Sequence, residues 1–268
     1  YSKYSKSIET SFTEPYLFDR NVSASVSIYR RDYNSFNYYN SDRNTTYQQA
    51  TTGIQLRAGV PLTEYLTAVA SYTLNYDDIS LDKAQFYTLD SATGQSKCNP
   101  LLAGRYLCES IGKRTSSIFG ASLIYDTLDN RVHPTRGVVA SLSADFAGLG
   151  GSVKYARLRA NASRYWPVGK GFIFSLSAEG GAIKSLDHSG SVIDGIDDVR
   201  LTDRFYLGEP QMRGFDIRGI GPRVLRKFYD ANGVLSTDRN QWVDDSIGGK
   251  YYYQGRAELE IPLGSGAK

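Results

Sequence analysis

Apolar residues recur at every second position in segments of about ten residues, and this alternation constrains the fold more than any other feature. In the segment 66–76, Leu66, Leu74 and the even positions between them are apolar, whereas Thr67 and Thr73 lie between them. Successive side chains of a β-strand point to opposite faces, so each such segment predicts a strand with one apolar face and one polar face. The predicted strands are 4–14, 21–31, 53–61, 66–76, 117–125, 138–146, 155–166, 172–182 and 251–263.

The length of these segments suits a membrane. About ten residues are needed for a tilted strand to cross a bilayer, which is long for a strand of a soluble sheet. No stretch approaches the roughly 20 apolar residues of a membrane helix, and the mean hydropathy of −0.38 excludes a helical membrane protein. A β-barrel is not excluded, because apolar and polar residues alternate along its strands and cancel in the mean hydropathy. A large soluble β-protein, with its polar face toward water, is the alternative.

The connections between the predicted strands favour the membrane interpretation. Long connections (32–52, 77–114 and 183–250) alternate with short ones, as in outer-membrane barrels, which have short turns on one side and long loops on the other. Proline, which interrupts a strand ladder, ends four strands that descend toward the short-turn side; these prolines are Pro15, Pro61, Pro167 and Pro262. Because neighbouring strands run in opposite directions, a single extra strand between 172–182 and 251–263 is not allowed. The alternating segment 199–207 is therefore placed inside the long connection 183–250.

Roughly nine antiparallel strands do not close a barrel, and an open sheet edge is unstable in lipid. We therefore predict an all-β fold, an antiparallel transmembrane β-barrel that is partial here. Residues 1–268 form one partial barrel domain, and further strands are expected outside this sequence.

Charge and residue types exclude several functions. Lys and Arg number 31 against 28 Asp and Glu, for a net charge of +3, so no concentrated basic face for nucleic acid is expected. The two histidines, His133 and His188, lie in polar connections, and no G-x-S-x-G turn accompanies them. We predict no catalytic residue, no metal site and no cofactor. An outer-membrane enzyme is the less favoured alternative, and a positive activity screen on peptides and lipids would support it.

The only two cysteines, Cys98 and Cys108, lie in the connection 77–114. No histidine lies in that connection, and the spacing does not match a zinc site. A close pair in an otherwise cysteine-free chain predicts a disulfide in an oxidising compartment. Free thiols are the alternative.

The connection 183–250 carries dense Gly, aromatic and Arg residues, which is unusual for a loop without a function. Arg213 is expected to project from a tight turn that Gly214 permits, with Phe215 anchored in an apolar pocket. An Arg entering a confined lumen needs a carboxylate partner, and Glu258 and Glu260 lie on the polar face of the next strand. An Arg-Gly turn on the surface is the alternative.

Several motifs resemble those of the BamA-type outer-membrane assembly barrels, a family that includes TamA-like and two-partner-secretion relatives. The Arg204–Gly208 run, the Met-Arg-Gly-Phe tetrad ending at Phe215, Gly221-Pro222 and Gly248-Gly249 match the family's sixth outer loop. The turn 125–137 matches a second family signature. Two departures are Met212, where the family usually has Val, and Glu209, where the family has the second glycine of a pair.

The resemblance implies a barrel of roughly sixteen strands, of which this chain looks like the fourth to the twelfth. It also implies that the sixth loop enters the lumen and that Arg213 pairs with Glu260 as first choice and Glu258 as second. The site residues of the loop motif are then Arg204, Gly208, Gly221, Pro222, Gly248 and Gly249.

The function implied by the resemblance is the folding and insertion of outer-membrane proteins in a bacterial outer membrane. The expected partners are the lipid bilayer, unfolded outer-membrane proteins and accessory lipoproteins, without nucleic acid. A translocation pore of the same superfamily, of the TamA-like or two-partner-secretion type, is the alternative. The number of periplasmic repeats encoded upstream would separate the two.

Overall fold

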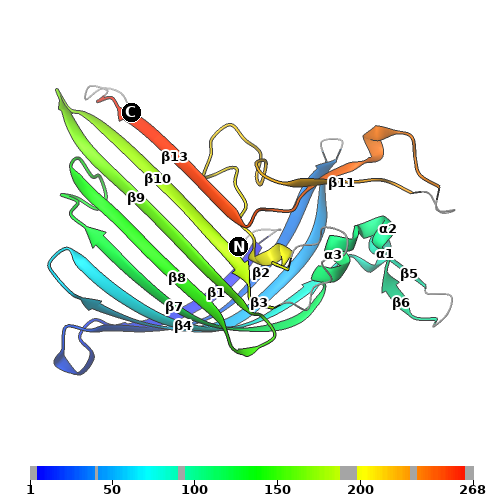
Figure 1. Cartoon of the computed structure of the whole chain (residues 1–268), viewed down its shortest axis with the longest axis horizontal. Helices are drawn as coiled ribbons and strands as arrows, with labels where there is room; N and C mark the ends of the chain where they lie inside the picture. The colour runs from blue at the N-terminus through cyan, green and yellow to red at the C-terminus, as the bar shows by residue number, and fades with distance from the viewer. Residues whose placement is uncertain (1–4, 40–41, 90–93, 188–197, 230–233, 263–268) are drawn as a thin grey trace.

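The computed structural model describes residues 5–39, 42–89, 94–187, 198–229 and 234–262. Nine long strands form one antiparallel sheet in chain order, which Figure 1 shows as a single curved wall. They are β1 (Ser5–Glu14), β2 (Ser23–Tyr39), β3 (Asp42–Pro61), β4 (Leu66–Ser80), β7 (Gly112–Asp126), β8 (Gly137–Gly151), β9 (Tyr155–Gly169), β10 (Phe172–Ser185) and β13 (Tyr251–Glu260). Each predicted segment is a strand, so the all-β prediction is confirmed. Within the described residues, no helix has the length and apolar character to cross a membrane.

The register of the sheet collects the apolar side chains on one face. Phe12 lies opposite Val26, Val26 opposite Leu56, and the row continues through Tyr72 to Phe119. Phe12, Leu56 and Phe119 of this row are solvent-exposed, with 66% of Phe12 and 46% of Phe119 accessible, whereas Val26 and Tyr72 are partly buried. An exposed apolar surface that continues across this many strands fits lipid and does not fit water.

The opposite face is polar and hydrogen-bonded across strands. The Tyr29 hydroxyl donates to Asn75 Oδ1 at 2.6 Å, across the strand that carries Gly53. A β-carbon at position 53 would collide with both side chains, so only glycine leaves room for this bridge. On β8 and β9, Asp145 accepts hydrogen bonds from Arg157 at 3.0 Å and Arg159 at 3.3 Å. This cluster of three charged side chains is thus paired on the polar face of the wall.

Two expectations about the connections were wrong. The region 32–52 is not an irregular loop, because β2 continues to Tyr39 and β3 begins at Asp42. Residues there are mostly polar on both faces, so no alternation revealed the strands. In addition, β9 continues through Pro167 to Gly169. Pro167 pairs beside an irregularity of register at Phe172 and Ile173, where the ladder tolerates a residue that cannot donate.

The region between β4 and β7 folds into short elements around a small core. They are α1 (Lys83–Phe86), β5 (Tyr87–Leu89), β6 (Ser96–Cys98), α2 (Pro100–Ala103) and α3 (Arg105–Ser110). Ile79, Phe86 and Leu107 are buried in this core. The predicted disulfide between Cys98 and Cys108 is present and links β6 to α3. Figure 1 shows these elements gathered at one end of the wall.

The region between β10 and β13 contains η2 (Leu201–Asp203), β11 (Arg223–Arg226), η3 (Arg239–Gln241) and β12 (Val243–Ser246). We refer to residues 198–250 as the long loop. Segment 199–207 lies outside the nine-stranded sheet, as expected. The strands β11 and β12 pair with each other and lie at the same end of the wall as α1–α3 (Figure 1).

Candidate functional site

The motif Arg204–Gly208 forms the base of the long loop. Arg204 Nε donates to the carbonyl of Val199 at 2.9 Å, and its Nη1 donates to the carbonyl of Ile247 at 3.2 Å. Phe205 and Gly249 exchange two backbone hydrogen bonds of 2.9 and 2.8 Å. The two ends of the loop are therefore held side by side before the chain enters β13.

The glycines of the motif permit close backbone contacts. A β-carbon on Gly248, whose φ is +65°, would lie 2.8 Å from the carbonyl oxygen of Phe205 and 2.9 Å from the ring of Tyr206. A β-carbon on Gly208 would lie 2.7 Å from the backbone nitrogen of Arg218. Larger residues at these positions would separate the segments, which explains the glycines in physical terms.

The remaining motif residues close the same base. The carbonyl of Pro222 accepts from the Ile247 backbone nitrogen at 3.0 Å, and Gly221 before it has a φ of +120°. A backbone hydrogen bond of 3.1 Å also joins Ile220 to Leu207. All six predicted motif residues, from Arg204 to Gly249, therefore lie in one structural unit.

Phe205 fixes this unit to the wall. Its ring centroid lies 4.7 Å from that of Tyr252 on β13, and its ring lies over Gly181 of β10. Gly181 pairs opposite Tyr252 in the sheet. Both wall positions are on the polar face, so the long loop packs against the inner side of the curve.

A second contact with the wall involves Arg218, which the sequence did not single out. Its Nη1 donates to the Tyr47 hydroxyl on β3 at 3.2 Å. The guanidinium carbon lies 4.2 Å from the ring centroid of Tyr206 and 5.6 Å from that of Tyr33 on β2. Burial alone would lower the pKa of Arg218, but the surrounding tyrosines raise it above its ordinary value. Arg218 thus remains a cation within an aromatic cage.

The predicted turn around Arg213 is present, but its anchoring differs from the expectation. Gly214 has a φ of +86°, which a left-handed turn requires. Phe215 does not fill an apolar pocket, since 49% of its surface is exposed. Arg256 Nη2 of β13 donates to the carbonyl of Gln211 at 2.9 Å and holds the turn near the wall.

The structure does not show the expected ion pair of Arg213 among the residues that it describes. Across the ranges that the structure describes, no salt bridge joins Arg213 to Glu258 or Glu260, and all three side chains are exposed. Glu260 Oε1 instead lies 2.8 Å from His133 Nε2. His188, the other histidine, lies outside the described residues.

His133 belongs to the turn between β7 and β8, the second motif found in the sequence. The Asp129 carboxylate organises this turn by accepting from the Thr135 side chain and from the backbone nitrogens of Thr135 and Arg136, both at 3.0 Å. These hydrogen bonds lower the pKa of Asp129 well below its usual range. The hydrogen bond that the His133 ring donates to the Glu260 carboxylate raises the pKa of His133. The turn therefore contacts the end of β13 across two intervening strands.

The long loop also binds the disulfide-containing region. Asp245 of β12 is buried and accepts from the Tyr106 hydroxyl of α3 and from Arg226 Nε at 3.0 Å. Arg226 Nη1 donates to the carbonyl of Leu102 at 3.0 Å. Burial and the neighbouring carboxylate raise the pKa of Tyr106, so its hydroxyl remains a donor.

These contacts hold segments of the chain together. In the part of the chain that the structure describes, no group of three or more His, Cys, Asp or Glu residues is placed to hold a metal ion. Sequence reasoning missed the contact of Arg218 with Tyr33 and Tyr47, because the two tyrosines lie in the region 32–52, where no alternation predicts strands. The abundance of tyrosine, 21 residues, was the available signal.

Comparison with protein families matches residues 1–268 to the Omp85 superfamily domain. The outer membrane protein assembly factor BamA of Neorickettsia risticii is 26% identical over 253 residues, covering 94% of this chain and 28% of that protein. The sorting and assembly machinery component 50 homolog of Mus musculus is 27% identical over 154 residues, covering 57% of this chain and 27% of that protein.

A solved structure shares the fold. The crystal structure of BamA from Haemophilus ducreyi lacking POTRA domains 1–3 matches with a TM-score of 0.69 and 20% sequence identity, over 99% of this chain and 46% of that one. The chain thus spans less than a third of the length of these two curated relatives and about half of the solved chain.

Proposed function

This chain belongs to the Omp85 superfamily, and we propose from this membership that it forms part of the barrel wall of an outer-membrane protein that folds and inserts β-barrel proteins. The observation that carries the proposal is the match of the whole chain to one superfamily domain, joined to a wall with an apolar outer face and a loop docked on its polar face. The relatives named as assembly factors support insertion over secretion.

We place the protein in an outer membrane. The BamA relative is bacterial and the Mus musculus relative is not, so the outer membrane is the broader assignment. The bacterial outer membrane is our narrower proposal. A disulfide at the end of the wall that carries the long loop is consistent with exposure of that end to an oxidising compartment.

The mechanism we propose is the addition of strands to a sheet edge. An incoming segment gains backbone hydrogen bonds by pairing with an exposed edge, and the alternate side chains then enter lipid or lumen. The chain described here supplies wall and loop rather than the reacting edge. Its partners are the bilayer, unfolded outer-membrane proteins and accessory lipoproteins, and no covalent catalysis is involved.

We further propose that Arg213 acts as a lumen latch, by which we mean an ion pair between the turn 211–215 and an acidic residue of the wall. Arg256, Glu258 and Glu260 lie on the same face of β13, and Arg256 already holds the turn through Gln211. Glu260 is engaged by His133, so Glu258 is the better placed partner on this strand.

Insertion is tested with the full-length protein in liposomes, by following the folding of a urea-denatured outer-membrane barrel into heat-resistant form. We expect liposomes with the protein to fold the substrate faster than empty liposomes. Equal rates would reject insertion, and export of an unfolded chain without its insertion would instead indicate a translocation pore.

The latch is tested in the same assay with Arg213→Ala, Glu258→Ala and Glu260→Ala. We expect Arg213→Ala to slow assembly and the effect of Glu258→Ala to be absent when Arg213 is already replaced. Unchanged assembly and unchanged heat resistance in all three variants would reject the latch while leaving insertion in place.

A further inference from the structure

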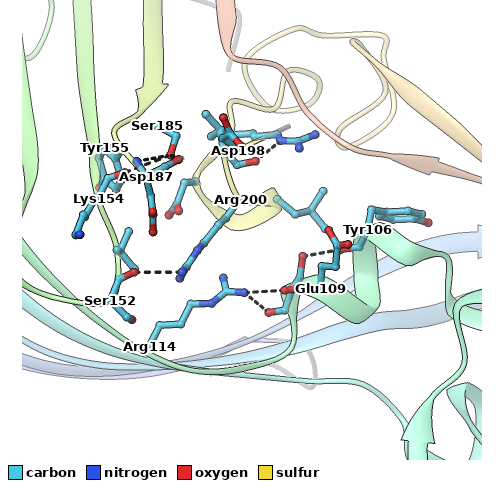
Figure 2. Close-up of a pocket in the computed structure, with 16 residues that line it drawn as sticks. Tyr106, Glu109, Arg114, Ser152, Lys154, Tyr155, Ser185, Asp187, Asp198 and Arg200 are labelled. Carbon is cyan, nitrogen blue, oxygen red and sulfur yellow. Dashed lines mark hydrogen bonds between the residues drawn. The ribbon is translucent and has the colours of Figure 1, made fainter. Parts of the chain in front are cut away.

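A cavity of about 180 Å³ lies on the polar side of the wall, between the long loop, α3 and the ends of β7, β9 and β10. Arg114 of β7 and Arg200 of the long loop both line it, and Figure 2 shows their side chains extending into the same space from opposite sides. Tyr106, Val199 and Arg204 also line it, but the contacts described above do not involve Arg114 or Arg200. The cavity has room for a small anion with some of its water.

The two arginines leave donors unused at this cavity. Arg114 is buried, with 9% of its surface accessible, and its Nη2 donates to the carbonyls of Ser110 at 2.7 Å and Glu109 at 3.3 Å. Arg200 Nη2 donates to the carbonyl of Ser152 at 3.2 Å. Across the described residues, Arg114 Nη1 and Arg200 Nη1 are shielded from solvent and have no hydrogen-bond partner. An orphaned guanidinium donor is costly, and two that line one cavity point to a missing acceptor.

The carboxylates around the cavity do not supply the missing hydrogen-bond acceptor. Glu109 is exposed and paired with Arg105 at 3.0 Å, and Asp198 is exposed. Asp203 attracts both arginines, yet its removal from water raises its pKa above the ordinary value. Asp187 and Lys154 complete the charged lining. Burial thus disfavours the ionised form of Asp203, the carboxylate that attracts both arginines.

We propose that this cavity is a binding site for a phosphate group, held between the guanidinium groups of Arg114 and Arg200. Arginine forks match phosphate oxygens in geometry and charge. The free Nη1 donors of the two side chains supply hydrogen bonds from two sides, and Asp203 is the competing internal anion. The site is independent of the proposed insertion activity. The phosphate is either soluble or the headgroup of a lipid.

The test uses the full-length protein in nanodiscs of zwitterionic lipid, titrated with inorganic phosphate by isothermal calorimetry. We expect saturable binding that Arg200→Gln weakens about ten-fold or more, because hydrogen bonds to a charged group are lost. Arg200→Gln is preferred to a change at Arg114, which also holds the end of α3. Asp203→Asn removes the competing anion and is expected to tighten binding.

Arg131→Gln is the matched control, since it removes the same charge from an exposed turn outside the cavity. We expect it to bind phosphate as the unmodified protein does, and circular dichroism checks that each variant is folded. Absence of saturable binding, or equal affinity of folded Arg200→Gln, overturns the proposal.

The source of the phosphate is separated by competition. Both glycerol 3-phosphate in solution and phosphatidic acid in the disc are tested against inorganic phosphate. Displacement by the soluble ester alone assigns a soluble ligand, and displacement by phosphatidic acid assigns a lipid headgroup. Failure of both to displace phosphate contradicts a site for phosphate esters and overturns the proposal.

Discussion

Arg218 donates a hydrogen bond of 3.2 Å to the hydroxyl of Tyr47, and this contact joins the long loop to a strand at the far side of the wall from β13. The guanidinium also lies over the ring of Tyr206, which belongs to the loop motif. One side chain therefore couples the interior of the loop motif to the wall.

Replacing Arg218 with Ala is expected to lower the free energy of unfolding by about 1–2 kcal/mol, since it removes a cation–π contact and a hydrogen bond. Thermal unfolding of the full-length protein in detergent measures this loss. Arg20→Ala, in the exposed turn after β1, is the control and is expected to unfold like the parent. Equal midpoints for both variants would show that the cage does not hold the loop.

Gly181→Ala is expected to displace the ring of Phe205 and to destabilise the protein by about 1–3 kcal/mol, as overpacking does. The new methyl group would lie 2.6 Å from the Tyr252 ring and 3.0 Å from that of Phe205. Gly255→Ala is the matched control in β13, because its β-carbon meets only an ordinary contact at 3.9 Å. Protease cleavage of the long loop should increase in the first variant only. A similar increase in both would contradict the packing argument.

The contact between His133 and Glu260 is expected to depend on pH. The pKa of His133 is raised in the folded protein, so its contribution is fully present below the ordinary value of 6.5 and is lost as the pH rises through the folded pKa. NMR titration of the His133 ring should show the raised pKa, and Glu260→Gln should return it toward 6.5. An unchanged titration in Glu260→Gln would exclude the contact as the cause.

Reduction of the Cys98–Cys108 disulfide is expected to cost about 2–3 kcal/mol, as for a short cross-linked loop. The Tyr106–Asp245–Arg226 contacts should hold α3 in place after reduction. Asp245→Asn combined with reduction should therefore expose the region 81–111 to protease far more than either change alone. Simple additivity of the two effects would show that the two connections act independently.

Much of the fold could be predicted because lipid imposes a strict rule on strands. Where a strand such as 66–76 crosses the bilayer, every second residue must be apolar, and the sequence pattern records this directly. Beyond the bilayer the rule no longer applies, so the extensions of β2 and β3 around Tyr33 and Tyr47 left no pattern. Their pairing depends on backbone hydrogen bonds, which any residue but proline can make.

The candidate site could be predicted in part for a similar reason. Glycines such as Gly208 and Gly248 are required by close backbone contacts, and the motif therefore identified the base of the loop. The side-chain partners could not be predicted, since Arg218 and Arg213 lie in similar Arg-Gly contexts. Only the three-dimensional path of the loop brings Arg218 to the tyrosines and leaves Arg213 exposed. The prediction that Arg213 pairs with an acidic wall residue remains to be tested.

The long loop contacts β13 and β10 through Phe205 and reaches β2 and β3 through Arg218, and five strands separate β3 from β13 in the sheet. The long loop thus connects strands that lie far apart in the curved sheet. It fixes the distance between remote strands of the sheet, and so the curvature of the wall. The curvature of the wall therefore depends on the long loop as well as on the pairing of its strands.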